Sequence, residues 1–444
     1  MADSRKTSFK ALYNVLYNKA YSNIEINRAI KASQLDRRDA ALASAIFYGV
    51  LERKLTLDRI IRQYSSLPIR KIEDKVLILL EQALYQILYL DKIPDSAAVN
   101  EAVNLCKKLR LSKSSGFVNG VLRSFLRADK AYKAPDISQN REESLSFTYS
   151  CPVEIIRILD KSYGKKHTED ILKSLFGRPP VTAAVNTLKT TPDKLIEALS
   201  QQGVKAVKSA IAGNSVGLFD TGSIEELDSF RQGLFYVQDE ASQIAIELLN
   251  PQSGETVIDV CSAPGGKSFK AAVMMGNKGE IYSYDLHPHK IELILKTAKR
   301  LGIDIISASV RDALSDEKTP LADKVICDVP CSGLGVIRRK PEIRYKNTDD
   351  FEELTDVQYK ILIKTSQLVK KYGVLLYSTC TLNKAENNDI AEKFLRENKS
   401  FKPLPLKLPE NIKRVIEEND NCLTLLPSEH NTDGFFVSAF VRCE

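Results

Sequence analysis

The chain has 444 residues, of which 43% are hydrophobic and 27% charged, a composition typical of a globular protein with more than one domain. No apolar run approaches the roughly 20 residues that a membrane-spanning helix needs, and Met1–Lys6 lacks the apolar stretch of a secretion signal. Eight cysteines in a chain of this length do not form a disulfide-rich pattern. We therefore expect free thiols and a cytoplasmic location.

The formal net charge of +7 is concentrated in the N-terminal third of the chain. Residues 1–140 hold 24 Lys and Arg against 14 Asp and Glu, whereas the remainder is close to neutral. A basic domain joined to a near-neutral one favours a polyanionic partner, above all nucleic acid. The alternative is that these charges lie on solvated helix faces without any partner.

Residues 1–135 are predicted to form an all-α domain. The apolar residues of Val99–Cys106 recur at the i, i+3, i+4, i+7 spacing of a helix packed against a core. A later helix carries Arg123 and Arg127 one turn apart on the same side, and these are candidate RNA contacts. The polar stretch from about 130 to 150 is expected to be a linker.

The remaining chain is predicted to form two further parts. Residues 150–232 are expected to form a small α+β subdomain, in which strands at 181–186 and 204–208 flank a helix opened by Thr191-Pro192. In residues 233–444 strands alternate with helices, which predicts a Rossmann-like α/β domain with a parallel sheet. Its expected strands are 256–260, 280–285, 304–308, 324–328 and 373–378, its helices include 288–301 and 354–371, and strands 422–426 and 435–441 should form an antiparallel hairpin at one edge.

A glycine-containing loop follows the first predicted strand of this sheet. Ligands of open α/β sheets bind outside the carboxyl ends of the strands. The loop is neither a G-x-G-x-x-G fingerprint nor a P-loop, which disfavours a dinucleotide and suits a compact cofactor with a carboxylate and a ribose. The candidate cofactor-binding residues of this loop are Cys261, Ser262, Ala263, Pro264, Gly265, Gly266 and Lys267.

Three aspartates follow other predicted strands of the same sheet. Asp285 could accept hydrogen bonds from ribose hydroxyls or could cap the helix that starts near Pro288. Asp312 could orient an adenine amino group or belong to a turn. Asp328 could bind the edge of a base or cap a turn.

Two cysteines stand at the ends of predicted strands, Cys331 in Asp-Val-Pro-Cys-Ser-Gly and Cys380 in Ser-Thr-Cys-Thr. A cysteine buried alone is usually an inert hydrophobe, as we interpret Cys106 and Cys327. The spacing of Cys327 and Cys331 could suggest a metal site, but the four histidines show no matching ligand spacing, so no metal is expected.

A pair of thiols at neighbouring strand ends suits methylation of a pyrimidine at carbon 5. Carbon 5 of cytosine is too weak a nucleophile to attack a methyl sulfonium directly. A thiolate that adds to carbon 6 makes carbon 5 nucleophilic, and a second thiol can assist the later loss of the carbon 5 proton. A carboxylate or a lysine, such as Asp328 or Lys267, could stabilise charge on the ring.

The motifs Asp259–Lys267, Asp328–Gly333 and Ser378–Thr381 together resemble the signature motifs of the RNA cytosine-C5 methyltransferases, the Nol1/Nop2/Sun family. Gly116–Arg123 resembles part of the NusB RNA-binding fold. A NusB-like domain before a Sun-like domain is the layout of the RsmB, Sun or Fmu type of this family. The resemblance covers nearly the whole chain.

The resemblance implies a class I methyltransferase that uses S-adenosyl-L-methionine, bound by the glycine loop with Asp285, Asp312 and Asp328. It also implies that Cys380 is the nucleophile and that Cys331 assists product release. The implied substrate is 16S ribosomal RNA, at cytosine 967 in the family's nomenclature. The enzyme is expected to be a monomer that contacts RNA through residues including Arg338 and Arg339.

Two alternatives remain at this point. The same chemistry could act on tRNA or on 23S ribosomal RNA, or the chain could be a non-catalytic RNA-binding assembly factor. The sequence also departs from the family, because Ala184 stands where an arginine is usual. That departure puts one RNA contact of the middle subdomain in doubt.

Overall fold

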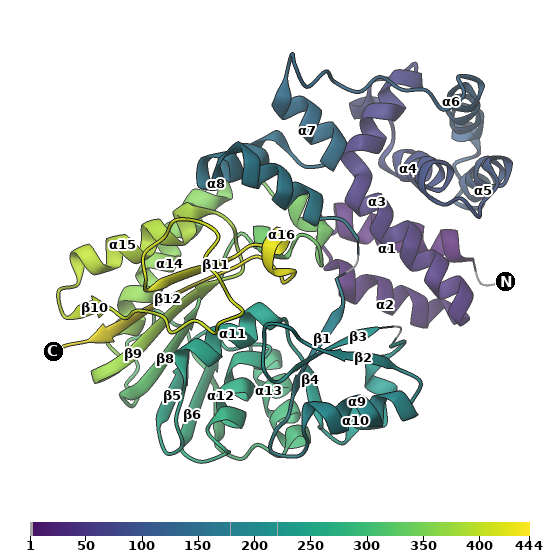
Figure 1. The fold of residues 1–444 in the computed structure, drawn as a ribbon. Helices are drawn as coiled ribbons and strands as arrows, with labels where there is room; N and C mark the ends of the chain where they lie inside the picture. The colour runs from purple at the N-terminus through teal and green to yellow at the C-terminus, as the bar shows by residue number, and fades with distance from the viewer. Residues whose placement is uncertain (1–2, 178, 220) are drawn as a thin grey trace. The chain divides into compact units, whose positions relative to one another are not determined.

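The structure is a computed structural model that describes residues 3–177, 179–219 and 221–444 (Figure 1). The chain divides into two compact units. Unit 1 comprises residues 1–176 together with 339–346, and unit 2 comprises 177–338 together with 347–444. Within the described ranges, no helix combines the length and the apolar character that crossing a membrane requires.

Unit 1 is all helical, as the sequence predicts. Its longest helix, α3, packs against α1, α4, α6 and α7 around one hydrophobic core. The expected linker is partly wrong, because residues 141–149 form α7, which Asn140 caps by accepting from the Glu143 N–H. The helices are α1 (Ser4–Tyr17), α2 (Ser22–Ser33), α3 (Arg37–Tyr64), α4 (Asp74–Tyr89), α5 (Asp95–Lys108), α6 (Ser115–Arg127), α7 (Arg141–Tyr149) and α8 (Val153–Ser174), with 3-10 turns η1 (Ile69–Lys71) and η2 (Ser112–Ser114).

A short segment from the C-terminal half of the chain also belongs to unit 1. Residues 339–346 contain the 3-10 helix η5 (Pro341–Tyr345). The side chain of Arg344 is fully buried and donates to the Leu175 carbonyl at 3.1 Å. The Tyr345 hydroxyl donates to the Leu51 carbonyl. The chain thus leaves unit 2 after Arg338 and returns to it at Asn347.

Unit 2 contains a small antiparallel sheet with the strand order β2-β3-β1-β4. The predicted strand, helix and strand are present, but the two strands are not neighbours, because β3 lies between them. Ala184 is buried in the hydrophobic core, so a side chain at this position does not face solvent. The elements are β1 (Val181–Val185), α9 (Pro192–Gln201), β2 (Lys205–Lys208), β3 (Ser215–Phe219), η3 (Ile224–Glu226), α10 (Asp228–Arg231) and β4 (Phe235–Val237).

The large sheet of unit 2 has the order β10-β12-β9-β8-β5-β6-β7, with β11 paired to β12 (Figure 1). In the part of the sheet with the order β9-β8-β5-β6-β7, each strand is parallel to the next, whereas β12 is antiparallel to β9. The elements are α11 (Glu240–Leu249), β5 (Thr256–Asp259), α12 (Gly266–Met274), β6 (Glu280–Asp285), α13 (Pro288–Leu301), β7 (Ile306–Val310), β8 (Ala322–Asp328), η4 (Leu334–Val336), α14 (Asp350–Ser366), β9 (Val369–Thr379), η6 (Lys384–Glu386), α15 (Asn388–Glu397), β10 (Phe401–Pro403), β11 (Cys422–Leu425), α16 (Pro427–His430) and β12 (Phe435–Arg442).

Helices cover both faces of this sheet, which explains its apolar strands. Ile326 of β8 packs in the cluster that contains α11, α12 and α13, whereas Val325 and Cys327 pack in the cluster that contains α14 and α15. One prediction needs correction: helix α14 ends at Ser366, and β9 already begins at Val369. The predicted late hairpin is present at one edge of the sheet, where β11 is paired antiparallel to β12 and β12 is paired to β9.

Candidate active site

The three sequence motifs follow three adjacent strands of the large sheet. In the order β9-β8-β5, the strand ends are Thr379, Asp328 and Asp259. Parallel neighbours end at the same edge, so the loops that follow them meet. The glycine loop between β5 and α12, the Cys331 loop and the Cys380 loop therefore form one site within unit 2.

The two candidate catalytic thiols are in contact. The Sγ atoms of Cys331 and Cys380 lie 3.3 Å apart, and both side chains are partly exposed. The hydrogen bond shared with Cys380 and burial raise the pKa of Cys331 well above its ordinary value. Cys327 is fully buried, and burial raises its pKa to about 12, which agrees with its interpretation as a packing residue.

Lys267 and Asp328 form a charged pair beside these thiols. Lys267 Nζ lies 2.7 Å from Asp328 Oδ2, and Ser378 Oγ donates to Asp328 Oδ1 at 2.7 Å. Burial lowers the pKa of Lys267, but the Asp328 carboxylate outweighs burial and the pKa lies above its ordinary value. Lys267 is thus a fixed ammonium group, and the charge of Cys380 favours it further.

A cavity of about 200 Å³ lies against the glycine loop. Gly265 has a φ of 103°, and a Cβ there would lie 2.5 Å from the Phe269 ring, so the tight turn requires glycine. The cavity includes residues that sequence reasoning did not assign to the site, among them Gln238 and Asp239. Its lining residues are Val237, Gln238, Asp239, Ser242, Asp259, Cys261, Ser262, Ala263, Pro264, Gly266, Lys267 and Asp328.

Asp259 is the buried acidic group of this cavity. Its Oδ2 accepts from Ser268 Oγ at 2.8 Å, while its Oδ1 is buried and has no hydrogen-bond partner. Burial raises the pKa of Asp259 to about 7. Such an orphaned oxygen and the cradle at Gly265 fit a small ligand that carries a hydrogen-bond donor.

Asp285 and Asp312 lie at the ends of β6 and β7 but do not line this cavity. The Asp285 carboxylate accepts from the His287 N–H at 3.0 Å and lies 3.4 Å from Lys290 Nζ. The Asp312 carboxylate accepts from the Leu314 N–H at 2.9 Å. Both side chains thus hold turns in this structure, and their contacts with a cofactor remain predictions.

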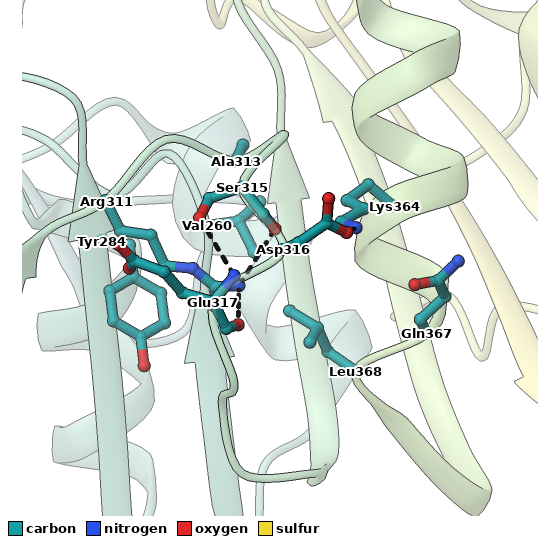
Figure 2. A pocket seen from close by; sticks show the side chains of 10 residues that line it. All are labelled: Val260, Tyr284, Arg311, Ala313, Ser315, Asp316, Glu317, Lys364, Gln367 and Leu368. Carbon is teal, nitrogen blue, oxygen red and sulfur yellow. Dashed lines mark hydrogen bonds and ion pairs between the residues drawn. The ribbon is translucent and has the colours of Figure 1, made fainter.

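A second cavity, of about 130 Å³, lies beside the loop that carries Asp312 (Figure 2). Figure 2 shows the Arg311 side chain reaching into the loop, where it donates to the carbonyls of Ser315 and Glu317. The Arg311 N–H donates to the Asp285 carbonyl at 3.1 Å. Arg311 therefore links the two turns that contain the predicted cofactor aspartates, a role that the sequence did not indicate.

The candidate RNA contacts are divided between the two units. Arg123 and Arg127 are exposed on α6 and donate to the neutral side chains of Asn119 and Ser124. Arg338 belongs to unit 2 and donates to the Gly177 carbonyl, whereas Arg339 belongs to unit 1. An RNA role for these four arginines remains a prediction.

A buried glutamate, Glu386, joins the two cysteine loops and was not identified from the sequence. Its Oε1 accepts from Ser332 Oγ at 2.5 Å and from Asn383 Nδ2 at 3.1 Å. Its Oε2 accepts from the Ser332 N–H and from Gln358 Nε2, both at 2.9 Å. Neither its residue type nor its spacing distinguishes Glu386 from surface glutamates nearby in the sequence.

Comparison with known proteins assigns the chain to a family. Three family models match it: 16S rRNA methyltransferase RsmB/F over residues 246–441, the NusB family over 2–127, and the ferredoxin-like domain of RsmF/B-like methyltransferases over 152–225. A Bacillus subtilis protein described as a probable ribosomal RNA small subunit methyltransferase B is 37% identical and aligns over 98% of this chain and 97% of its own length. The chain belongs to this methyltransferase family.

Other similar proteins support the same assignment. A Synechocystis protein with the same description is 34% identical over 99% of both chains. The crystal structure of PH0851 has a TM-score of 0.85 at 26% identity and covers 98% of both chains. A methyltransferase homologue from Pyrococcus horikoshii has a TM-score of 0.59 at 26% identity and covers 68% of this chain and 99% of its own.

Membership in the family confirms several predictions from the sequence. The protein is a methyltransferase whose cofactor is S-adenosylmethionine. Its architecture is the predicted one, with an all-α NusB-like region, a small α+β region and a C-terminal methyltransferase domain.

Proposed function

We propose that this protein methylates carbon 5 of a cytosine in 16S ribosomal RNA, at the RsmB-type site (cytosine 967), through a covalent bond between Cys380 and carbon 6. The observation that carries the proposal is the contact between the Cys331 and Cys380 sulfurs, 3.3 Å apart, beside the charged pair of Lys267 and Asp328. The relatives' descriptions support small-subunit ribosomal RNA as the substrate.

The two thiols divide the reaction between them. Cys380 adds as a thiolate to carbon 6, and the Lys267 ammonium, held by Asp328, stabilises charge that develops on the ring. S-adenosylmethionine supplies an electrophilic methyl group when it is bound. After carbon 5 is methylated, Cys331 passes its thiol proton to the sulfur of Cys380 as the S–C6 bond breaks. Cys331 takes the carbon 5 proton in exchange, and the electrons of that C–H bond restore the C5–C6 double bond.

The cavity residues fit the cofactor. The N-terminus of α12 presents free N–H groups at Gly266 and Lys267, which suit a carboxylate. The orphaned Oδ1 of Asp259 suits an ammonium group or a water that contacts it. Asp285 and Asp312 would hold the ribose and the adenine, with Arg311 linking their turns.

The substrate must present an unpaired base. A cytosine reaches such a pocket only when it leaves its stack, so a loop or an unfolded region of the RNA is the expected setting. The positive charge of residues 1–140 supports contacts with phosphates in unit 1. Those contacts should weaken as salt concentration rises.

Two variants test the covalent route. We expect Cys380→Ala to abolish turnover and to form no adduct. We expect Cys331→Ala to add to cytosine but to release product poorly, which leaves an RNA–protein adduct that survives denaturing electrophoresis. The route is wrong if Cys331→Ala turns over normally while Cys380→Ala traps RNA.

Bisulfite sequencing of total RNA from a deletion strain tests the substrate. The expected result is the loss of one methylated cytosine in 16S ribosomal RNA. Loss of a mark in tRNA or 23S ribosomal RNA would replace the proposed substrate, and no lost mark would favour a non-catalytic factor.

A further inference from the structure

The carboxylate of Glu386 is enclosed by donors and has no exposed surface. Gln358 Nε2 donates both to Glu386 and to the Pro330 carbonyl, so its amide orientation is fixed by two acceptors. Asn383 Oδ1 accepts from the Ala385 N–H, which directs its Nδ2 at Glu386. Because the Ser332 N–H is also an obligate donor, the surroundings of Glu386 match an ionised carboxylate, which only accepts.

These hydrogen bonds join the two cysteine loops. Ser332 directly follows Cys331 and donates twice to Glu386. Ser332 Oγ also lies 2.6 Å from Thr381 Oγ1, and Thr381 directly follows Cys380. A buried hydrogen-bond network of this kind favours one arrangement of the loops that it joins. The two sulfurs carried by the joined loops lie 3.3 Å apart.

The charges around the two sulfurs differ. Glu386 disfavours a negative charge on Cys331, as does the neighbouring Cys380. The ammonium group of Lys267, which Asp328 holds at 2.7 Å, interacts instead with Cys380. Sulfurs in contact cannot both ionise readily, because like charges at this distance repel.

From this arrangement we infer that Glu386 is a positioning residue for the proposed methyl transfer: it holds the Cys331 loop against the Cys380 loop and keeps the proton of the thiol pair on Cys331. This inference rests on the proposed function. It gives a reason, within this chain, for Cys380 being the nucleophile.

The rate at which iodoacetamide modifies each cysteine tests the inference without RNA, because the thiolate is the reacting form. Mass spectrometry of peptides gives separate rates for Cys331 and Cys380, with Cys443 as the internal reference. In the wild type we expect Cys380 to react faster. In Glu386→Gln we expect the ratio of the Cys380 rate to the Cys331 rate to fall about tenfold. This change corresponds to a difference of about one pKa unit between the two thiols.

A control and a second variant complete the experiment. Glu392→Gln removes the same charge from an exposed position of α15 and should leave the ratio unchanged.

Gln358→Met removes the hydrogen bond to the Pro330 carbonyl but keeps the Glu386 carboxylate. We expect kcat to fall about tenfold, the KM for the cofactor to stay unchanged and the RNA adduct to accumulate.

The outcomes separate the inference from the proposed function. An unchanged rate ratio in folded Glu386→Gln overturns the inference. If Glu386→Gln does not fold, the Gln358→Met variant tests the inference instead. A wild-type kcat in Gln358→Met, with no accumulated RNA adduct, then overturns the inference. If Cys331→Ala traps no RNA, the proposed function fails, whereas the alkylation ratio still tests the role of Glu386.

Discussion

Lys267 Nζ lies 2.7 Å from Asp328 Oδ2, so the helix after the glycine loop is joined to the strand that precedes Cys331. This pair connects the cavity at the glycine loop to the thiols. Each partner is partly or largely shielded from water, where opposite charges interact more strongly than at the surface.

We expect Lys267→Met to lower kcat about 100-fold, because it removes the ammonium group that the proposed mechanism places beside the reacting ring. Asp328→Asn should have a similar effect, and the double variant should be much less impaired than the product of the two single effects. RNA methylation assays with tritiated cofactor give these values. Fully additive effects would show that the two residues act separately.

Lys270→Met is the matched control for that experiment. Lys270 is buried in the same helix and pairs with Glu247 at 2.6 Å, and neither residue is among those that line the cavity. Its replacement should lower the thermal midpoint, while the folded fraction keeps the wild-type kcat.

Gly335→Ala should disrupt the Cys380 loop. The Gly335 N–H donates to the Cys380 carbonyl at 3.0 Å, and a Cβ on Gly335 would lie 2.0 Å from the Gly434 carbonyl oxygen. We expect kcat to fall at least about tenfold. Gly120→Ala in α6, where a Cβ meets nothing within 4 Å, should keep its activity and be equally or more stable. Equal activities of the two variants would contradict the proposed tight contact.

Asp259 should make stability depend on pH when no cofactor is present. Its pKa is about 7 in the folded chain and 3.8 is the ordinary value, so the folded state holds an extra proton between these values. The contribution of this group to the free energy of unfolding is therefore fully present below about pH 4 and is lost as pH rises through 7. In that range the free energy of unfolding should fall by up to about 1.4 kcal/mol per pH unit. Urea unfolding at several pH values should show this slope, and Asp259→Asn should remove it. A slope that persists in the variant would assign it to another group.

Lys54→Met should destabilise unit 1. Lys54 Nζ lies 2.7 Å from Glu81, which is fully buried, and 2.8 Å from Asp58. Removing the cation leaves the buried Glu81 carboxylate beside the partly exposed Asp58 carboxylate, and we expect the free energy of unfolding to fall by about 3 kcal/mol. Urea unfolding followed by far-UV circular dichroism measures this cost. Lys108→Met, which removes an exposed ion pair with Asp3, should leave the midpoint unchanged. Equal midpoints for the two variants would rule out the cluster of Lys54, Asp58 and Glu81 as a stabilising feature.

The sequence predicted the elements and the meeting of the motifs because both depend on local patterns. Asp259, Asp328 and Thr379 end apolar strands, and parallel strands bring such ends together. The interior position of β12 depends on its pairing with β9, which no local pattern specifies.

The network of Glu386 and the inclusion of residues 339–346 in unit 1 were not predictable in the same way. Gln358, Ser332 and Glu386 are far apart in the chain and meet only after α14 packs on the sheet. Arg344 is fully buried, whereas arginine is a residue type expected at the surface. Both features arise from tertiary packing.

The excursion of residues 339–346 limits how the protein can be dissected. A fragment that ends near residue 176 would lack the turn around Arg344, and a fragment that starts at residue 177 would carry that turn without Leu51 and Leu175. Truncation mutants would therefore damage both halves at once, and loss of activity in such a mutant could not be credited to the missing helices alone.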